Sequence, residues 1–149
     1  MNLENEIKPV VKTRTVSLDI ETAFELFTRR IGEWWPIDAF SIAGADVTGV
    51  RFEEEVGGRV VEITSGGEQS WADVTLWDPP HRFCLAWHPS ADSEVSTDLE
   101  VSFAETETGT EVRLEHRGWE RLGENGPAVR ESYQTGWKTV LAPFEDLAG

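Results

Sequence analysis

The stretch PAVRESYQTGWKTVLAPFEDL, residues 127–147, decides how we expect this chain to fold. Its apolar residues recur at steps of three and four, which places them on one face of a helix: Val129, Tyr133, Trp137, Val140, Leu141, Phe144 and Leu147. Asn125 or Gly126 can cap the helix, and Pro127 suits its first turn because its missing N–H would be unpaired there. Pro143 is expected to kink or shorten the last turn. A helix this long needs a broad apolar surface to lie against.

The chain before this helix supplies that surface as a series of short strands. Apolar and polar residues alternate in a pattern that predicts strands at the following positions: 8–18, 47–53, 59–64, 70–77, 82–87, 97–103 and 110–117. Asp19 is expected to cap a helix over residues 23–30, and a further helical turn follows over 33–36. Residues 37–46 and 89–94 are expected to be irregular.

This order predicts an α+β fold. Successive hairpins favour an antiparallel sheet of about seven strands, apolar on one face, and the terminal helix is the cover available for that face. The order is one strand, two short helices, about six strands and the long helix. We therefore expect a curved antiparallel sheet wrapped around a long C-terminal helix, with space left between them where the facing side chains do not fill it.

Length and charge bound the class of protein. The chain has 149 residues, which is most simply one domain over 8–149 behind a flexible arm over 1–7. A formal net charge of −15 argues against nucleic-acid and anionic-membrane partners. The acidic run 53–55 is interpreted as a solvated strand edge that discourages sheet pairing, with cation binding as a minor alternative. No stretch is apolar enough to span a membrane, no secretory signal is visible, and a single cysteine fits a reducing cytoplasm.

A histidine and three aromatic residues form the first candidate site: His116, Trp119, Tyr133 and Trp137. His116 shares the apolar parity of Val112 and Leu114, at the end where the strand leads to the helix. An inward histidine in a dry pocket can donate to a ligand carbonyl or act as a general base. The alternative is structural, with the ring packed and bonded to the backbone, and we favour it.

Asp73 is the second candidate. Strict alternation puts Trp71, Asp73, Thr75 and Trp77 on one face of their strand, and Ala72, Val74 and Leu76 on the other. If the first face points inward, Asp73 is a buried carboxylate of the kind that marks functional sites. If the second does, Asp73 is solvated, which is the interpretation that we favour. Periodicity alone does not choose between the two.

Several single residues have a structural interpretation as well as a functional one. Trp34 and Trp35 can form the mouth of a cavity or plug the end of the sheet. Trp87 is expected to line the core or the pocket, whereas His88 points the other way and should be exposed. Cys84 has no histidine beside it in sequence, so a nucleophilic role is not expected. Motifs for zinc hydrolases, nucleotide binding and serine hydrolases are absent, three scattered histidines make no metal set, and no cofactor is predicted.

Several short motifs, through their order and spacing, carry a family resemblance. They are AFELF at 23–27, WWP at 34–36, VGGR at 56–59, WDPPHR at 77–82, GTEV at 109–112, HRGW at 116–119 and YQTGWKTVL at 133–141. With them, the chain resembles the SRPBCC superfamily of START-like, birch-pollen-allergen-like helix-grip domains over about residues 10–147. Within it, the chain is similar to the branch named after the activator of the heat-shock-protein-90 ATPase.

The resemblance implies a hydrophobic cavity between sheet and terminal helix that takes lipids, polyketides or aromatic compounds. Residues expected to line it are Trp35, Phe52, Phe83, Trp87, Leu99, Val101, Val112, Leu114, His116, Trp119, Tyr133 and Trp137. The expected function is binding of a small hydrophobic molecule. The alternatives are a co-chaperone-like interaction domain, including a homodimer or a chaperone complex, and a polyketide cyclase or dehydratase of the same fold with His116 as its candidate catalytic residue.

Overall fold

A computed structural model describes residues 8–35, 47–87 and 96–148 of the chain. The predictions for the arm 1–7, for segments 37–46 and 89–94 and for His88 lie outside these residues. The division into one domain and an arm therefore stays a prediction.

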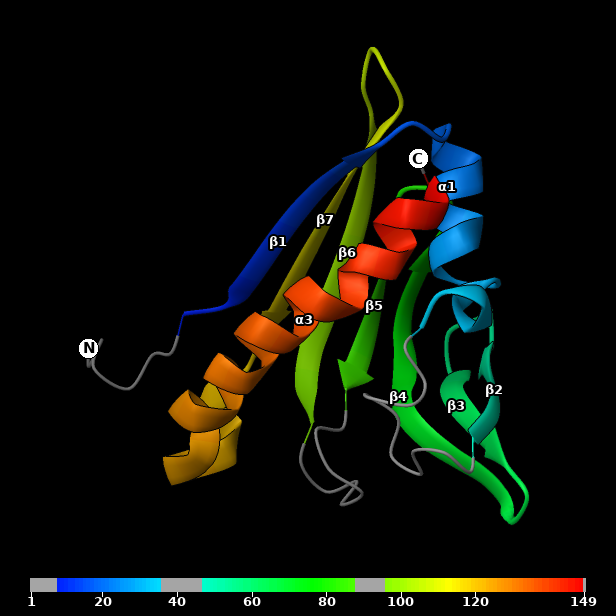
Figure 1. Cartoon of the computed structure of the whole chain (residues 1–149). Helices are drawn as coiled ribbons and strands as arrows, with labels where there is room; N and C mark the ends of the chain where they lie inside the picture. The colour runs from blue at the N-terminus through cyan, green and yellow to red at the C-terminus, as the bar shows by residue number, and fades with distance from the viewer. Residues whose placement is uncertain (1–7, 36–46, 88–95, 149) are drawn as a thin grey trace.

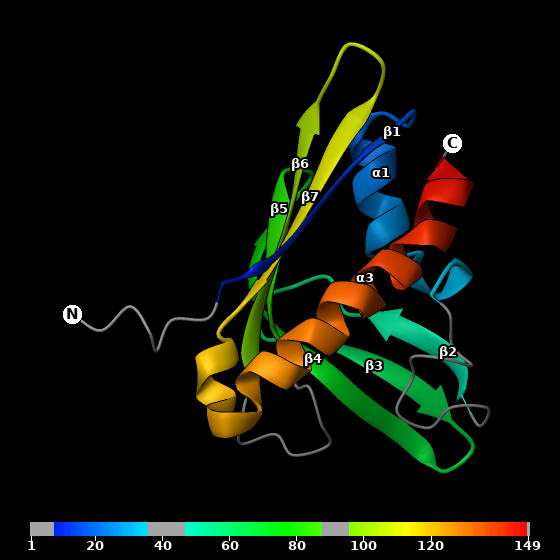
Figure 2. The same cartoon turned by 60° about the vertical axis from the view of Figure 1, so that its left-hand side comes forward.

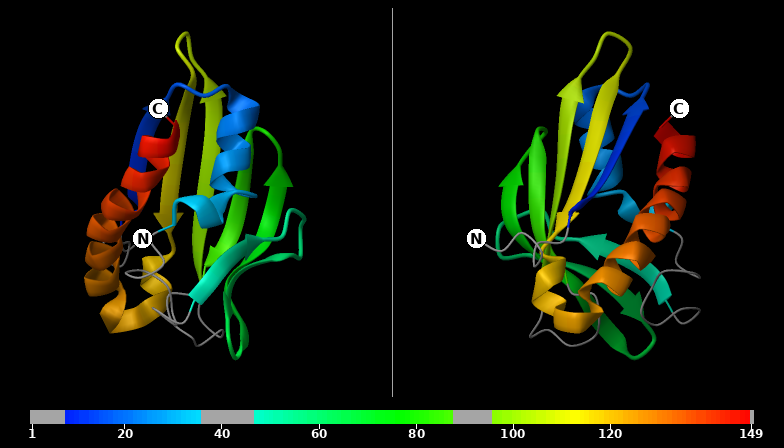
Figure 3. Two further views of the ribbon diagram at one scale, coloured as in Figure 1. Left: turned by 45° about the vertical axis from the view of Figure 1, so that its right-hand side comes forward. Right: turned by 90° about the vertical axis from the view of Figure 1, so that its left-hand side faces the viewer.

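The described strands form one curled antiparallel sheet, which confirms the predicted fold class (Figure 1). The strands are β1 (Val10–Val16), β2 (Val47–Phe52), β3 (Arg59–Thr64), β4 (Gly67–Asp78), β5 (Arg82–Trp87), β6 (Thr97–Glu105) and β7 (Thr110–Arg117). Their order across the sheet is β1-β7-β6-β5-β4-β3-β2, and every neighbouring pair is antiparallel. Because β1 joins beside β7, the first and last strands of the chain are neighbours. Figure 3 shows how β2 and β3 curl round beneath the long helix.

Two short helical segments cover one end of the concave face. Helix α1 (Ile20–Phe27) begins where Asp19 accepts a hydrogen bond from the Thr22 backbone N–H, which confirms the predicted cap. The helix begins three residues earlier than expected. A single 3₁₀ turn, η2 (Ile31–Glu33), then leads into Trp34 and Trp35. Trp34 is buried and donates its indole N–H to the Leu26 carbonyl at 2.8 Å, so it closes this end of the core.

The long helix α3 (Gly126–Ala148) crosses the concave face, as Figure 2 shows. A short 3₁₀ segment, η4 (Trp119–Asn125), leads into it from β7. Pro143 lies inside α3 and the helix continues to Ala148, so the expectation that the proline shortens it was wrong. Leu147 is 51% exposed and lies off the buried face to which periodicity assigned it, because the sheet and α1 do not cover that side of the last turn.

The C-terminal half of α3 is held by aromatic packing and by polar contacts with the first strand. Phe144 is fully buried, with its ring 5.1 Å from that of Phe27 and 5.2 Å from that of Trp34. Ser17 donates to the carbonyl of Ala148, and Arg14 pairs with Glu145. These contacts fix the end of the helix against both α1 and the edge of the sheet.

Strand β4 departs from strict alternation at two β-bulges. The register with β3 shifts so that Trp71 has no partner, and the register with β5 shifts so that Thr75 has none. A bulge adds one residue and changes which face the following side chains point to. As a result Trp71 and Ala72 are both buried, and Asp73 is exposed. The assignment of Trp71 and Asp73 to one face was therefore wrong, and the solvated interpretation of Asp73 agrees with the structure.

The acidic run at 53–55 lies past the end of β2 and not on a strand as expected. Its first carboxylate, Glu53, accepts hydrogen bonds from the Arg51 guanidinium at 3.0 Å and from the Arg59 backbone N–H at 2.9 Å. It therefore braces the turn between β2 and β3.

Phe144→Ala should lower the free energy of unfolding by roughly 3–5 kcal/mol, because it removes a fully buried ring that contacts two others. Leu147→Ala, three residues on in the same helix, is the matched control and should cost about 0.5 kcal/mol or less. Urea unfolding followed by circular dichroism measures both. Equal losses would contradict the described seating of the helix.

Candidate functional site

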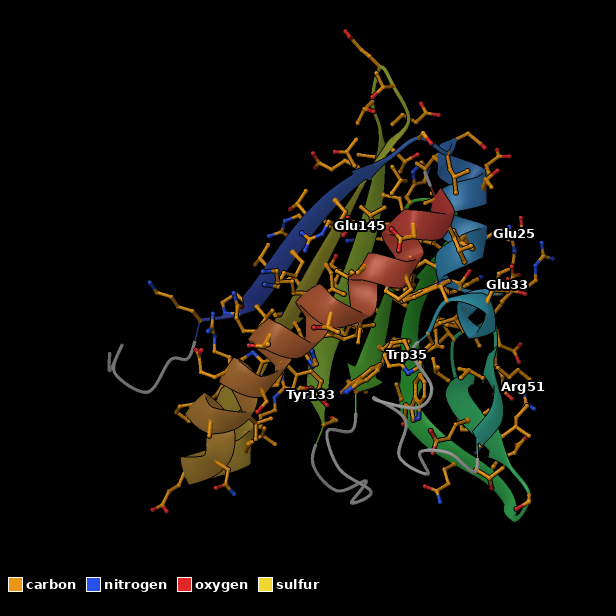
Figure 4. All side chains as sticks on the ribbon, viewed as in Figure 1. Glu25, Glu33, Trp35, Arg51, Tyr133 and Glu145 are labelled. Atoms are coloured by element: carbon orange, nitrogen blue, oxygen red, sulfur yellow. The ribbon has the colours of Figure 1, made fainter. Side chains whose placement is uncertain are left out.

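A cavity of about 220 Å³ lies between the N-terminal half of α3 and the sheet. Its lining residues are Trp35, Trp87, Ser132, Tyr133, Gly136, Trp137 and Val140. Figure 4 labels two of them, Trp35 on the chain after η2 and Tyr133 on the helix. The described walls are three tryptophans and a tyrosine, and none of the described lining residues is charged. Such a space suits a small neutral aromatic molecule.

Three parts of the chain position these walls. On α3 the lining residues follow the helical repeat, because Ser132, Gly136 and Val140 are spaced by four and so lie on one face. Gly136 has no side chain, which leaves room beside the helix. Trp87 is the last residue of β5, and Trp35 follows η2, so both rings come from the ends of elements.

The tryptophan rings stand close enough to hold one another in place. Trp35 lies 4.6 Å from Trp71, 6.2 Å from Trp87 and 6.0 Å from Trp137, measured between ring centroids. Tilted and edge-on pairs at such distances are favourable beyond the area they bury. The Trp71 indole N–H in turn donates to the buried carboxylate of Glu62 at 3.0 Å. The walls on the sheet side are therefore braced from behind.

Tyr133 presents a hydroxyl to the cavity. Its oxygen accepts the indole N–H of Trp87 at 3.0 Å, so the hydroxyl proton is left to donate. Burial raises the pKa of the Tyr133 hydroxyl above its ordinary value, and the hydrogen bond from Trp87 partly opposes that rise. The hydroxyl therefore stays protonated at neutral pH.

Trp35 carries the second polar group at the cavity. Its side chain is buried, and its Nε1 is the one buried side-chain nitrogen or oxygen among residues 8–35, 47–87 and 96–148 that lacks a hydrogen-bond partner. A buried N–H without an acceptor costs roughly 1–3 kcal/mol. This donor is therefore a feature that packing alone does not explain.

His116 is fully buried, and both of its ring nitrogens are engaged. Its Nδ1 accepts the indole N–H of Trp137 at 3.0 Å, and its Nε2 lies 2.6 Å from the hydroxyl of Thr97. An indole N–H only donates, so Nδ1 is unprotonated and Nε2 carries the proton, which it donates to Thr97. The His116 carbonyl accepts from the indole of Trp119 at 3.0 Å. This geometry favours the structural alternative, although the partners of the ring are side chains and not the backbone as expected, and a role as general base stays a prediction.

The environment keeps His116 neutral. Burial lowers its pKa from 6.5 to about 3, against a smaller opposing effect of the Asp98 carboxylate. A neutral imidazole can accept from Trp137, whereas an imidazolium cannot. The hydrogen bond that orients the Trp137 wall therefore depends on the uncharged form.

Acid should unfold the protein partly through this histidine. The unfolded chain takes up the His116 proton near pH 6.5 and the folded chain only near pH 3, so stability falls as pH decreases through that interval and is unaffected above it. The loss should be at most about 1.4 kcal/mol per pH unit. Urea unfolding between pH 7 and pH 4 should give a shallower profile for His116→Gln than for the wild type. The exposed His81 is the matched control, since His81→Gln should keep the wild-type slope; parallel profiles for all three proteins would contradict the assignment.

Four of the twelve residues predicted for the site line the cavity: Trp35, Trp87, Tyr133 and Trp137. His116 and Trp119 lie directly behind Tyr133, with ring centroids 5.1 and 5.2 Å from it. The other six belong to the buried core: Phe52, Phe83, Leu99, Val101, Val112 and Leu114. Binding of a ligand by any of these residues stays a prediction.

Sequence reasoning missed three lining residues, Ser132, Gly136 and Val140. Their spacing of four along the helix, with a glycine at the centre, was the signal that could have found them. It also missed the buried Trp71–Glu62 pair behind Trp35, because the bulge at Trp71 is not visible in the alternating pattern.

The remaining candidates offer no chemistry in the described part of the chain. Burial raises the pKa of the Cys84 thiol, which keeps it protonated and unreactive. No group of three or more histidine, cysteine, aspartate or glutamate side chains there could hold a metal ion. None of the described helices is long and apolar enough to cross a membrane.

The comparisons with known proteins agree with this geometry. A family model described as activator of Hsp90 ATPase homolog 1-like protein matches residues 17–149. The chain belongs to this family. It is therefore a member of the SRPBCC superfamily, as the sequence motifs suggested. No curated protein is similar enough to count as a match.

Solved structures of similar fold include two with substantial sequence identity. The anthrahydroquino-gamma-pyrone synthase Txn09 is 31% identical, with a TM-score of 0.65 over 95% of this chain and 97% of its own. The self-sacrificing resistance protein CalC from Micromonospora echinospora is 29% identical, with a TM-score of 0.71 over 95% and 94%. Protein MLL2253 from Mesorhizobium loti has a TM-score of 0.70 at 19% identity over 94% and 96%, a likeness of fold alone.

Proposed function

We propose that this protein binds a small, neutral, aromatic molecule in the cavity between α3 and the sheet. The observation that carries the proposal is the lining itself, which places four aromatic side chains around about 220 Å³ and includes no charged side chain among its described residues: Trp35, Trp87, Tyr133 and Trp137 are the aromatic ones. Aromatic walls favour flat apolar ligands through burial and ring contacts. A charged ligand would lose its hydration here with no opposite charge to replace it.

The volume limits the size of the ligand. Cavities for drug-sized molecules measure roughly 300–1,000 Å³, and a dry cavity of about 150 Å³ takes a single benzene ring. At about 220 Å³, this cavity suits one ring or two fused rings. A lipid with long acyl chains is correspondingly disfavoured.

The name of one relative supports an aromatic ligand that carries oxygen, although the compound in that name is larger than the one or two rings inferred from the volume. One similar structure is that of a synthase named for an anthrahydroquino-gamma-pyrone, a fused aromatic compound, and another is that of a resistance protein. Both structures align with nearly the whole length of this chain. We infer an oxygenated aromatic compound as the ligand class, with the cytoplasm as the predicted compartment.

Naphthalene should bind the wild-type protein, and Gly136→Leu should abolish that binding, because the added side chain grows from a residue that lines the cavity. The matched control is Thr139→Leu, which adds the same side chain to an exposed position of the same helix and should bind as the wild type does. Equilibrium dialysis with chromatographic detection measures the dissociation constants, and circular dichroism checks folding. Unchanged binding by a folded Gly136→Leu variant would exclude this cavity as the site.

A second candidate is catalysis on such a ligand. It is favoured by the 31% identity to the synthase and by the Tyr133 hydroxyl, which can donate a hydrogen bond to a ligand oxygen that gains negative charge during a reaction. Mass spectrometry of ligands recovered after incubation separates catalysis from binding, since a binding protein returns its ligands unchanged.

Interaction with the Hsp90 chaperone rests on the family name, and a pull-down with purified Hsp90 tests it.

A further inference from the structure

We propose that the cavity selects ligands that carry a carbonyl oxygen, which accepts a hydrogen bond from the Trp35 indole N–H. This inference rests on the proposed function and narrows it from aromatic molecules in general to aromatic carbonyl compounds such as pyrones and aryl ketones. Two residues that line the cavity, Trp35 and Tyr133, each carry a donor without an acceptor, and none of the described lining residues is charged; together these observations lead to this class.

The first step is that Trp35 differs from the other buried tryptophans. Each of the others donates its indole N–H to a protein acceptor at 2.8–3.0 Å. The pairs are Trp34 with Leu26, Trp71 with Glu62, Trp87 with Tyr133, Trp119 with the His116 carbonyl and Trp137 with the His116 ring. Among the described residues, the fold therefore supplies an acceptor wherever a tryptophan is buried, except at Trp35, one of the three tryptophans that line the cavity.

The second step is the chemistry of the partner that would satisfy this donor. An N–H needs an acceptor, and an apolar cavity favours one that costs little to desolvate. A carbonyl oxygen meets both conditions and has two lone pairs. An ammonium group has no lone pair to offer.

The third step is that the second free donor, the Tyr133 hydroxyl, also needs a hydrogen-bond acceptor on the ligand. The Tyr133 oxygen already accepts from Trp87, which leaves its proton for an acceptor. Trp35 and Tyr133 come to the cavity from different elements, Trp35 from the chain after η2 and Tyr133 from α3 (Figure 4). A ligand with oxygen atoms at both edges could satisfy both.

Chromone and naphthalene are matched probes, since both are flat pairs of fused six-membered rings and only chromone carries a carbonyl. Their dissociation constants should be measured by equilibrium dialysis for the wild type and for Trp35→Phe. Trp137→Phe is the matched control, because it also removes an indole from the cavity wall, but one whose N–H is already bonded to His116. The ratio of the two constants cancels effects of ring size that act on both probes.

The preference for chromone over naphthalene should fall roughly fivefold to tenfold in Trp35→Phe, and change less than about twofold in Trp137→Phe. An unchanged ratio in Trp35→Phe, or an equal fall in both variants, would overturn the inference while leaving the proposed function intact. Failure of both probes to bind the wild type would overturn the proposed function itself.

A measurement on the wild type guards against a variant that does not fold. The indole N–H resonance of Trp35, assigned by nuclear magnetic resonance, should move downfield when chromone is added and not when naphthalene is added. The same displacement with both probes, or with neither, would contradict a hydrogen bond to the carbonyl.

Discussion

Helix α3 is held against the concave face of the sheet at its C-terminal half and by hydrogen bonds at Tyr133 and Trp137, and the cavity lies beside the glycine between those two residues. At its C-terminal half, Phe144 packs between Phe27 and Trp34. Nearer its N-terminus, Trp137 is bonded to His116 on β7. Because Tyr133 and Trp137 are bonded to the sheet on either side of Gly136, which has no side chain to fill the gap, a space remains beside this glycine.

The polar groups of the interior serve this arrangement. His116 links β7 to α3 through Trp137 and to β6 through Thr97, and Trp87 links β5 to α3 through Tyr133. Each hydrogen bond pairs one donor with one acceptor inside an apolar core, where an unpaired polar group would lower the stability of the fold. Together they fix the orientation of three of the four aromatic walls. Trp35 is the wall whose polar atom is not used in this way.

This division of roles agrees with membership of a family built on one sheet and one helix. Such a fold can keep its frame while the few side chains between helix and sheet change, and function then depends on those side chains. Here they are aromatic, uncharged and provided with two hydrogen-bond donors. The chain carries a formal net charge of −15, but none of the described residues that line the cavity is acidic.

The sequence by itself determined the frame of this protein. The repeat of three and four residues located α3, period-two alternation located the strands and the inward direction of His116, and Asp19 marked the start of α1. These features are local, because each follows from the geometry of a single element. The tertiary structure decided which residues meet at the cavity, since Trp35 and Trp87 reach it from the ends of separate elements. It also decided the bulge at Trp71, which buries Trp71 beside Ala72 and leaves Asp73 exposed, and the exposure of Leu147, because these depend on pairing and coverage by distant segments.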